Sequence, residues 1–326
     1  MLNVGVIGIG MMGQNHARVY SEIANLVGIT DPDEEMLGEV SKRFKIEGYK
    51  HFHDLLERKD LDAVSVSSPT STHFEVTCAA IEAGKHVLVE KPMGGDLEKA
   101  RELVAKAKKK GVVLAAGFIE RHNPVVCLTK NLIEKKGFGD VISVSSRRVS
   151  SFPSRIKDVG VILDLGIHDI DVIRYLLDSK VKSVYALSGE TGEKEFEDHA
   201  NILLEFESGV FAFIEVNWLT PMKVRKVSLT CSLNFVEMDY INQNLQISSS
   251  IIKKLDISNL YRIPQEYEER KIEVERREPL KNELSDFLNA IEHGGEPLVS
   301  GEEGVRTLEI AHAAMLSAEK GEKILI

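Results

Sequence analysis

Three glycines near the amino terminus constrain the fold of this chain more than any other feature. Gly8, Gly10 and Gly13 form G-x-G-x-x-G between an apolar run, LNVGVIG, and a helical pattern, GMMGQNHARVYSEIA. Gly8 allows a tight turn, Gly10 lets a pyrophosphate approach the backbone, and Gly13 lets the helix pack closely on the strand. Any tight turn could use such glycines. However, a strand precedes them, a helix follows, and an acid, Asp31, ends the next apolar run about twenty residues on, which predicts a dinucleotide site at the helix amino terminus.

Asp31 also indicates which dinucleotide binds. A carboxylate at this position accepts hydrogen bonds from the ribose hydroxyls of NAD and repels the additional phosphate of NADP. Asp33, Glu34 and Glu35 add to the negative charge, and no arginine follows closely. The sequence therefore predicts NAD as the cofactor.

The pattern of apolar runs predicts two domains in a chain whose 326 residues exceed one typical core. Up to residue 120, short apolar runs alternate with helical patterns, which indicates an α/β, doubly wound parallel sheet with helices on both faces. From residue 121, runs such as HANILLEFE and VFAFIEVNWL follow one another without helices of matching length. We expect an α+β domain with a largely antiparallel sheet over residues 121–326, and the last helix is a candidate for packing back on domain 1–120.

One face of the second sheet is expected to be covered by the helix of residues 160–177. The other face is expected to be solvated or buried against a partner subunit. VFAFIEVNW is apolar on both sides, which is compatible with a subunit interface, although a sandwich core would give the same pattern. Residues 207–209 predict a hairpin turn. Residues 241–280 have no clean period and receive no predicted element, whereas 280–295 and 301–321 read as two closing helices.

The stretch GVILDLGIHDIDVIRYLL places polar side chains in an apolar helix. Asp164, His168, Asp171 and Tyr175 fall within about 60° of arc on one face. Buried polar groups are costly unless they meet other polar groups, a cavity or a ligand. The alternative is a helix whose wet side carries acids, with Asp164 capping its start.

Glu90, Lys91 and Pro92 follow the fourth apolar run, at the strand edge where ligands bind in open parallel sheets. Pro92 excludes ordinary helical geometry at Lys91. An exposed Glu–Lys pair is the alternative and contributes little. The apolar strand and its position at the cofactor edge favour a functional lysine.

Composition excludes several classes of protein. The net charge of −10 argues against nucleic acid as a partner. Three widely separated cysteines predict neither a disulfide framework nor a metal site and fit a reducing cytoplasm, and no compact His, Asp or Cys cluster indicates a metal. No signal peptide and no membrane span are expected.

Three segments, VGVIGIGMMGQNHARVY, SSPTSTHFEVTCAAIEAGKHVLVEKPM and DLGIHDID, resemble the glucose–fructose oxidoreductase, inositol dehydrogenase and MocA family over nearly the whole chain. The resemblance implies a Rossmann domain that binds NAD(P), an open-faced sheet domain that often mediates oligomerisation, here as a homodimer or homotetramer, and a cis bond before Pro92. It also implies that Lys91, Asp164 and His168 form the catalytic group. The predicted cofactor site comprises Gly8, Gly10, Met11, Met12, Gly13, Asp31, Ser68, Pro69, His73, Glu90 and Lys91.

Substrate contacts are predicted from a local excess of positive charge. Arg147, Arg148, Arg155 and Lys157 lie within a stretch that contains no acid, and arginine forks match phosphate oxygens. A basic strand and loop facing solvent is the alternative. GFIERHNPVV, RIKDVGVILDLGIHDIDVIRYL and VNWLTPMK are similar to the subgroup of the family that oxidises UDP-N-acetylglucosamine at its 3-hydroxyl, although His122 stands where that subgroup suggests an aromatic residue. The predicted substrate contacts are Asn123, Arg148, Arg155 and Asp171.

Three other functions agree with parts of the sequence. An inositol or free-sugar dehydrogenase would use the same residues. A non-catalytic NAD-binding regulatory protein would keep the glycines but need neither Lys91 nor the pair of Asp164 and His168. A redox-neutral lyase or glycosidase that recycles NAD would usually need metal ligands.

Overall fold

The computed structural model describes residues 1–153, 159–191, 196–250 and 267–326. The chain forms two compact units, the first from Met1–His122 with Glu278–His312 and the second from Asn123–Arg277 with Ala313–Ile326. Residues 278–312, predicted to belong with the second domain, thus pack with the first unit. The chain crosses between the units three times, the last time within one helix.

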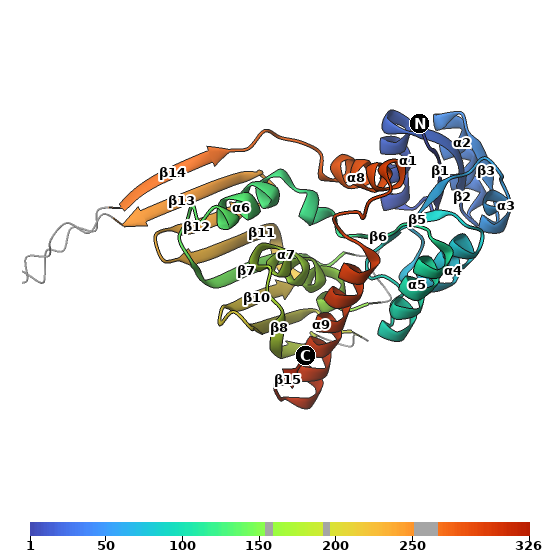
Figure 1. Ribbon diagram of the computed structural model, residues 1–326. Helices are drawn as coiled ribbons and strands as arrows, with labels where there is room; N and C mark the ends of the chain where they lie inside the picture. Colours follow the sequence, from blue (N-terminus) through green and yellow to red (C-terminus); the bar gives the residue numbers. More distant parts are fainter. Residues whose placement is uncertain (154–158, 192–195, 251–266) are drawn as a thin grey trace, which may run out of the picture. The chain divides into compact units, whose positions relative to one another are not determined.

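The first unit contains a parallel sheet in the order β3-β2-β1-β4-β5-β6 (Figure 1). This is a doubly wound order, in which the direction of winding reverses between β1 and β4. All carboxyl ends of the strands lie at one edge, so the turns that follow β1, β2, β4 and β5 share that edge. The strands are β1 (Asn3–Ile7), β2 (Asn25–Thr30), β3 (Glu47–Tyr49), β4 (Ala63–Val66), β5 (His86–Glu90) and β6 (Leu114–Gly117).

Helices connect these strands and begin where side chains can cap them. Asp33 accepts hydrogen bonds from the backbone N–H groups of Glu35 and Met36 and starts α2, and Asp96 caps α5 in the same way. Gly111, with φ at +69°, ends α5. The connecting elements are α1 (Met11–Ile23), α2 (Glu34–Phe44), α3 (Phe52–Leu56), η1 (Thr70–Thr72), α4 (His73–Glu82), α5 (Leu97–Lys110) and η2 (Ile119–His122).

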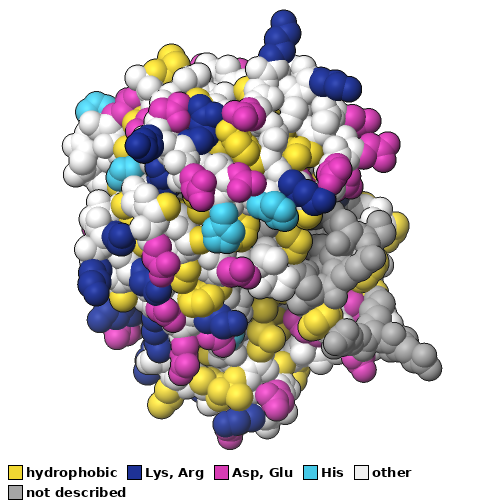
Figure 2. Space-filling view, turned by 90° about the vertical axis from the view of Figure 1, so that its right-hand side faces the viewer, with side chains coloured by type: hydrophobic (Ala, Val, Ile, Leu, Met, Phe, Trp, Pro, Cys, Tyr) yellow, Lys and Arg dark blue, Asp and Glu magenta, His cyan; other side chains and the backbone are white. Residues whose placement is uncertain are grey.

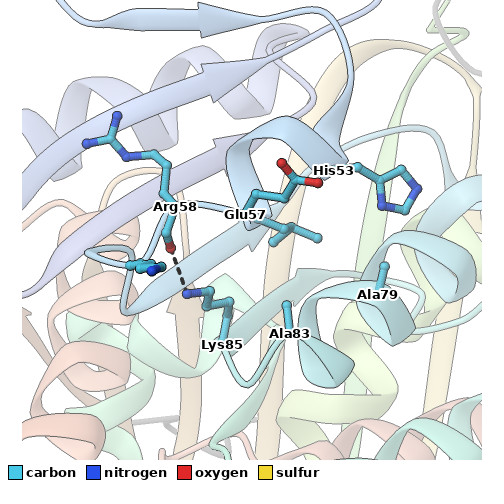
Figure 3. Close-up of a pocket in the computed structure, with 8 residues that line it drawn as sticks. His53, Glu57, Arg58, Ala79, Ala83 and Lys85 are labelled. Atoms are coloured by element: carbon cyan, nitrogen blue, oxygen red, sulfur yellow. Dashed lines mark hydrogen bonds between the residues drawn. The ribbon is translucent and has the colours of Figure 1, made fainter.

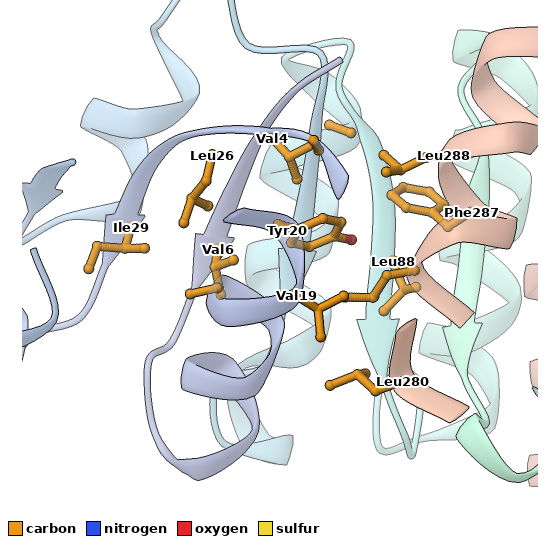
Figure 4. Packing of buried hydrophobic residues seen from close by; sticks show 14 of the residues in the cluster. Val4, Val6, Val19, Tyr20, Leu26, Ile29, Leu88, Leu280, Phe287 and Leu288 are labelled. Carbon is orange, nitrogen blue, oxygen red and sulfur yellow. The ribbon is translucent and has the colours of Figure 1, made fainter. Parts of the chain in front are cut away.

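A helix from the far end of the chain completes the core of the first unit. α8 (Pro279–His293) places Leu280, Leu284 and Phe287 against residues of β1 and α1, including Val4 and Tyr20 (Figure 4). These side chains are almost fully buried. Apolar burial at this site therefore holds residues 278–312 in the first unit. α9 (Gly301–Lys320) follows and runs from the first unit into the second.

The second unit contains a mixed sheet in the order β14-β13-β12-β11-β7-β10-β9-β8-β15. Its neighbouring strands pair antiparallel except β10 and β7, which pair parallel. α6 (Pro124–Glu134), η3 (Ile162–Gly166) and α7 (Ile167–Leu177) pack on one face, as predicted for the helix of residues 160–177. The strands are β7 (Val141–Ser151), β8 (Val181–Gly189), β9 (His199–Phe206), β10 (Phe211–Asn217), β11 (Leu219–Cys231), β12 (Phe235–Asp239), β13 (Asn244–Ser250), β14 (Tyr267–Glu273) and β15 (Ile324–Leu325).

Two details of this sheet bear on the sequence predictions. β9 and β10 pair as a hairpin, and Gly209 in the turn between them has φ at +85°, which confirms the predicted turn. β13 and β14 pair within residues 241–280, for which no element was predicted. The segment between these two strands lies outside the described residues.

The face of this sheet opposite α7 carries exposed apolar side chains. Along β10, Ala212, Ile214 and Val216 are buried, whereas Phe211 and Phe213 are 50% and 42% exposed. Cross-strand pairing places Tyr185, Leu203 and Phe213 in one row. We name this cluster the outer sheet face; it consists of Tyr185, Leu187, Leu203, Phe211, Phe213 and Phe235.

On the face shown in Figure 2, acidic and basic side chains lie interspersed. Among the described residues, no helix combines the length and the apolar character that a membrane span requires.

Candidate functional site

The turn after β1 has the geometry that the three glycines predict. Gly8 has φ at +83°, and a Cβ there would lie 2.6 Å from the Cα of Ser68. A Cβ on Gly13 would overlap the carbonyl oxygen of Gly8, whereas a Cβ on Gly10 would meet nothing within 4 Å. Close packing therefore requires glycine at positions 8 and 13, and open space lies beside Gly10.

The amino terminus of α1 suits an anion. Among the described residues no side chain caps this helix, and its first turn contains no acid. Its first N–H groups and the positive end of the helix dipole are thus available for a phosphate. Met11 is exposed and Met12 half-buried at this end. The cradle fits a dinucleotide pyrophosphate.

Asp31 is fixed beside this turn by two backbone donors. The N–H of Ile9 donates to Oδ2 of Asp31 at 2.9 Å, and the N–H of Asp33 donates to Oδ1 at 3.0 Å. The carboxylate follows β2 directly and keeps further lone pairs for ribose hydroxyls.

A buried histidine joins two loops at the same edge. His73, which is 1% exposed, places Nε2 at 2.8 Å from the carbonyl oxygen of Ser68 and Nδ1 at 3.1 Å from that of Pro92. Ser67 Oγ donates to the carbonyl oxygen of Gly8. The segment after β4, with Ser68 and Pro69, is therefore tied both to the glycine turn and to the turn after β5.

Lys91 follows β5, which is the fifth strand along the chain. The sequence pattern placed this lysine after the fourth apolar run, because the short β3 was not predicted. Lys91 is half-buried, and its bond to Pro92 is cis, as the family resemblance implied. Glu90 accepts from the N–H of Lys91 at 3.3 Å through Oε2, and Oε1 lies 3.1 Å from Nε2 of His16 on α1. Burial alone would raise the pKa of Glu90, but the hydrogen bond from His16 and nearby positive charge hold that pKa below its ordinary value.

In the second unit, the predicted polar stripe begins in a wide helical turn. η3 is a π-helix, in which the N–H of Ile167 bonds the carbonyl oxygen of Ile162, five residues earlier. The uniform α-helical phase assumed for Asp164 through Tyr175 is therefore wrong over residues 162–166. Asp164 and Asp171 are buried, while His168 is half-buried just after this turn. Single π-turns of this kind are frequent at functional sites.

Glu197 anchors the start of this helical segment. Its Oε1 accepts from the N–H of Ile162 at 3.1 Å, and its carbonyl oxygen accepts from the N–H of Val161. A Cβ on Gly160 would overlap the Glu197 carboxylate, so a larger residue here would require the Glu197 side chain to shift. Burial raises the pKa of Glu197.

Two of the predicted substrate contacts have partners within the protein. Arg148 is 1% exposed and its Nε donates to Oδ2 of Asp169 at 2.6 Å, inside the second unit, with its guanidinium over the ring of Tyr240. Asn123 is 2% exposed, caps α6 by accepting from the N–H of Val125, and donates to the carbonyl oxygen of Tyr240. Both side chains thus form contacts within the second unit, and their contact with substrate stays a prediction.

The remaining predicted contacts differ in position. Arg147, the neighbour of Arg148, is exposed and pairs with Glu215. Asp171 is buried on α7. Arg155 and Lys157 lie outside the described residues. His122 is buried, and burial together with the charge of Arg121 lowers its pKa to about 4, so the ring is neutral at neutral pH.

A surface pocket of about 420 Å³ lies elsewhere in the first unit, between α3 and α4 (Figure 3). Lys85 at its rim donates to the carbonyl oxygens of Arg58 and Leu61, both at 2.9 Å. Lys85 precedes β5, so the pocket lies at the amino edge of the parallel strands. That edge is opposite to the one that carries Gly8 and Lys91.

Two buried side chains, one in each unit, pair with predicted site residues but were not predicted from the sequence. His16 contacts Glu90, and Asp169 pairs with Arg148. His16 lies three residues after Gly13, on the side of α1 that faces the sheet, and this spacing was the available signal. Nothing in the sequence separates it from a histidine that merely fills a core.

The chain matches two family models. Residues 2–118 match the GFO/IDH/MocA oxidoreductase family model, described as an NAD-binding Rossmann fold, and residues 128–234 match the GFO/IDH/MocA C-terminal domain. The chain is 30% identical over 318 residues to the UDP-N-acetylglucosamine 3-dehydrogenase of Acidithiobacillus ferrooxidans, covering 98% of this chain and 97% of that one. It is 29% identical over 336 residues to the myo-inositol 2-dehydrogenase of Thermotoga maritima, covering 99% and 98%.

Solved structures agree with these matches. A crystal form of the Acidithiobacillus ferrooxidans enzyme superposes with a TM-score of 0.87 at 29% identity and covers 98% of each chain. A levoglucosan dehydrogenase in complex with NADH and levoglucosan superposes with a TM-score of 0.89, covering 100% of this chain and 99% of that one. Its identity is 22%, so this second likeness concerns the fold.

Replacing Arg148 with methionine is expected to lower the free energy of unfolding by about 3–5 kcal/mol, because the buried Asp169 carboxylate loses its ion-pair partner. Urea unfolding followed by circular dichroism measures the change, and a second substitution, Asp169→Asn, should recover part of it. Arg147→Met is the matched control on the same strand and should cost less than about 1 kcal/mol. Equal losses at the two arginines would contradict the structural role of Arg148.

Proposed function

This chain belongs to the GFO/IDH/MocA family and is an NAD-dependent dehydrogenase of sugars or polyols, and from that premise we propose that it oxidises UDP-N-acetylglucosamine at the 3-hydroxyl. The observation that carries this proposal is similarity over 98% of the chain to an enzyme of that name. Myo-inositol is the second candidate substrate, because the inositol dehydrogenase of Thermotoga maritima is similar over the same length at nearly equal identity.

The first unit supplies the cofactor site in this proposal. The backbone N–H groups of Gly10, Met11 and Met12 would bind the pyrophosphate. The Asp31 carboxylate would accept hydrogen bonds from the ribose hydroxyls. Ser68 and Pro69 would line the same edge, with His73 holding their loop. When bound, NAD accepts the hydride from the alcohol carbon.

The protein's own contribution is to remove a proton and stabilise the oxygen that loses it. We assign His168 as the general base, since an imidazole titrates near neutral pH and the ring is half-buried. Asp164 would orient that ring from the preceding wide turn. Lys91 would place its ammonium near the substrate oxygen and stabilise developing alkoxide charge. Asp171 would act on substrate only through its neighbours, because its side chain is buried.

The proposal is tested by measuring NAD reduction with a panel of substrates. The purified protein is incubated with UDP-N-acetylglucosamine, other UDP-sugars, free sugars and inositols, and NADH formation is followed at 340 nm. We expect the highest kcat/KM with UDP-N-acetylglucosamine. A preference for myo-inositol would select the second candidate, and binding of NAD without reduction by any alcohol would favour a regulatory protein.

Lys91→Ala and His168→Ala should each lower kcat by about 10²–10⁴-fold, because each removes a group that acts on the proton or oxygen in the transition state. NAD binding, measured by calorimetry, should persist in both variants. Lys59→Ala and His53→Ala change exposed residues at the pocket of Figure 3 and serve as matched controls. Near-normal turnover in both catalytic variants would refute the assignment.

Asp31 should make the enzyme prefer NAD. We expect kcat/KM with NAD to exceed that with NADP by at least about tenfold, because the carboxylate repels a 2′-phosphate. Asp31→Ala should narrow that ratio, mainly by improving use of NADP. Comparable efficiency of the unmodified protein with both cofactors would show that this residue does not select between them.

The outer sheet face supports a homo-oligomer. Several half-exposed aromatic and aliphatic residues on one face of a sheet, with Tyr185, Leu203 and Phe213 in one row, are unusual for a free surface, and the family resemblance points to a second copy as their cover. Phe213→Glu should shift the protein toward monomer in analytical ultracentrifugation, because a charge would be buried. Leu298→Glu, at an exposed site in the first unit, is the control. A monomeric unmodified protein would contradict this assignment.

A further inference from the structure

The helix that holds the cofactor turn also contacts the residue before Lys91. His16 lies on α1, three residues after Gly13, and is fully buried. Its Nε2 is 3.1 Å from Oε1 of Glu90, the last residue of β5. α1 therefore contacts both the glycine turn, at its amino terminus, and the end of β5, one turn later.

The chemistry of this contact makes His16 the donor. An ionised carboxylate only accepts hydrogen bonds, so Nε2 of His16 must carry the proton. Nδ1 of His16 is buried and has no hydrogen-bond partner among the described residues. The neutral tautomer, with its proton on Nε2, leaves one lone pair unsatisfied, whereas a protonated ring would bury a donor with no acceptor.

Both carboxylate oxygens of Glu90 have a hydrogen-bond partner. Its Oε2 accepts from the N–H of Lys91, and a Cβ on the paired residue Gly117 would come within 3.1 Å of its carboxylate. Because Oε2 accepts from the N–H of Lys91, the position of this carboxylate is coupled to the backbone at Lys91.

We propose that His16 is a positioning residue, which holds the Glu90 carboxylate and through it the turn that presents Lys91 to the substrate. The inference rests on the proposed function, because it needs Lys91 to act in catalysis. Without His16, a buried carboxylate oxygen loses its donor, and a carboxylate in that condition reorganises or takes up a proton. The turn that carries Lys91 then loses its fixed geometry.

Tyr20 provides a matched control on the same helix. It lies one turn after His16, is fully buried, and its hydroxyl is 2.8 Å from Oγ of Ser65 on β4. The rings of His16 and Tyr20 meet edge to face. Tyr20→Phe thus removes a buried hydrogen bond between α1 and the sheet without touching Glu90.

The test compares kinetics of four single variants and one double variant on the best substrate of the panel. His16→Ala should lower kcat by about 10- to 100-fold, since small displacements of a catalytic group cost this much, while KM and the NAD dissociation constant change less than about threefold. His16→Gln keeps an N–H donor and should restore most of the loss. Tyr20→Phe should leave kcat within about threefold of the unmodified enzyme.

The double variant His16→Ala with Lys91→Ala decides whether His16 acts through Lys91. If it does, the histidine substitution costs nothing further once Lys91 is absent. The same fold loss in both backgrounds, or no rescue by glutamine, overturns the inference. If Lys91→Ala leaves turnover normal, the proposed function fails and this inference fails with it. If Lys91→Ala lowers turnover but His16→Ala does not, this inference fails and the proposed function stands.

A measurement that does not depend on turnover tests the inference even if the enzyme oxidises no alcohol of the panel. The rate at which trinitrobenzenesulfonate modifies Lys91, mapped by peptide mass spectrometry, reports the environment of its amine. We expect this rate to differ between the unmodified protein and His16→Ala, and to be the same in Tyr20→Phe. Equal rates in all three proteins overturn the inference.

Discussion

The close approach of α1 to β1 is the constraint on which the rest of the first unit depends. It is possible only because Gly13 has no side chain, since a Cβ there would overlap the carbonyl oxygen of Gly8. This contact sets α1 at the carboxyl edge of the sheet with its free N–H groups directed at that edge. It also brings His16 within hydrogen-bond distance of Glu90 and Tyr20 within hydrogen-bond distance of Ser65. One helix, α1, thus contacts both the cofactor turn and the residue that precedes Lys91.

In this protein, apolar burial supplies stability, whereas the buried polar pairs restrict the geometry of packing. Side chains such as Phe287 and Ile202 supply the area that stabilises each unit, but many packings of a helix on a sheet would bury similar area. The pairs His16–Glu90 and Arg148–Asp169 each need two particular side chains within hydrogen-bond distance, so they restrict how the elements that carry them pack. Asp169 follows His168 directly, so the ion pair that holds α7 on β7 also limits the rotation of the helix that carries the proposed base.

Much of the fold was predictable because it depends on local pattern. Five of the six parallel strands are apolar runs, and β3 was missed because Glu47, Gly48 and Tyr49 form a short edge strand with no apolar stripe. The place of α8 was not predictable, because an amphipathic helix shows that it has a buried face but not which core receives it. The π-turn at Asp164 was missed for a similar reason: apolar spacing predicts a helix but does not show where its hydrogen bonding widens by one residue.

The sequence by itself determined the dinucleotide turn, the acid that follows β2, and the positions of Lys91, Asp164 and His168 along the chain. These features are short and contiguous, and their spacing carries the geometry. Only the tertiary structure decided that Arg148 and Asn123 are buried and bonded within the second unit, and that His16 contacts Glu90. Charge along a sequence does not reveal burial, because a side chain is buried or exposed according to partners that lie 21 residues away for Arg148 and 74 for His16.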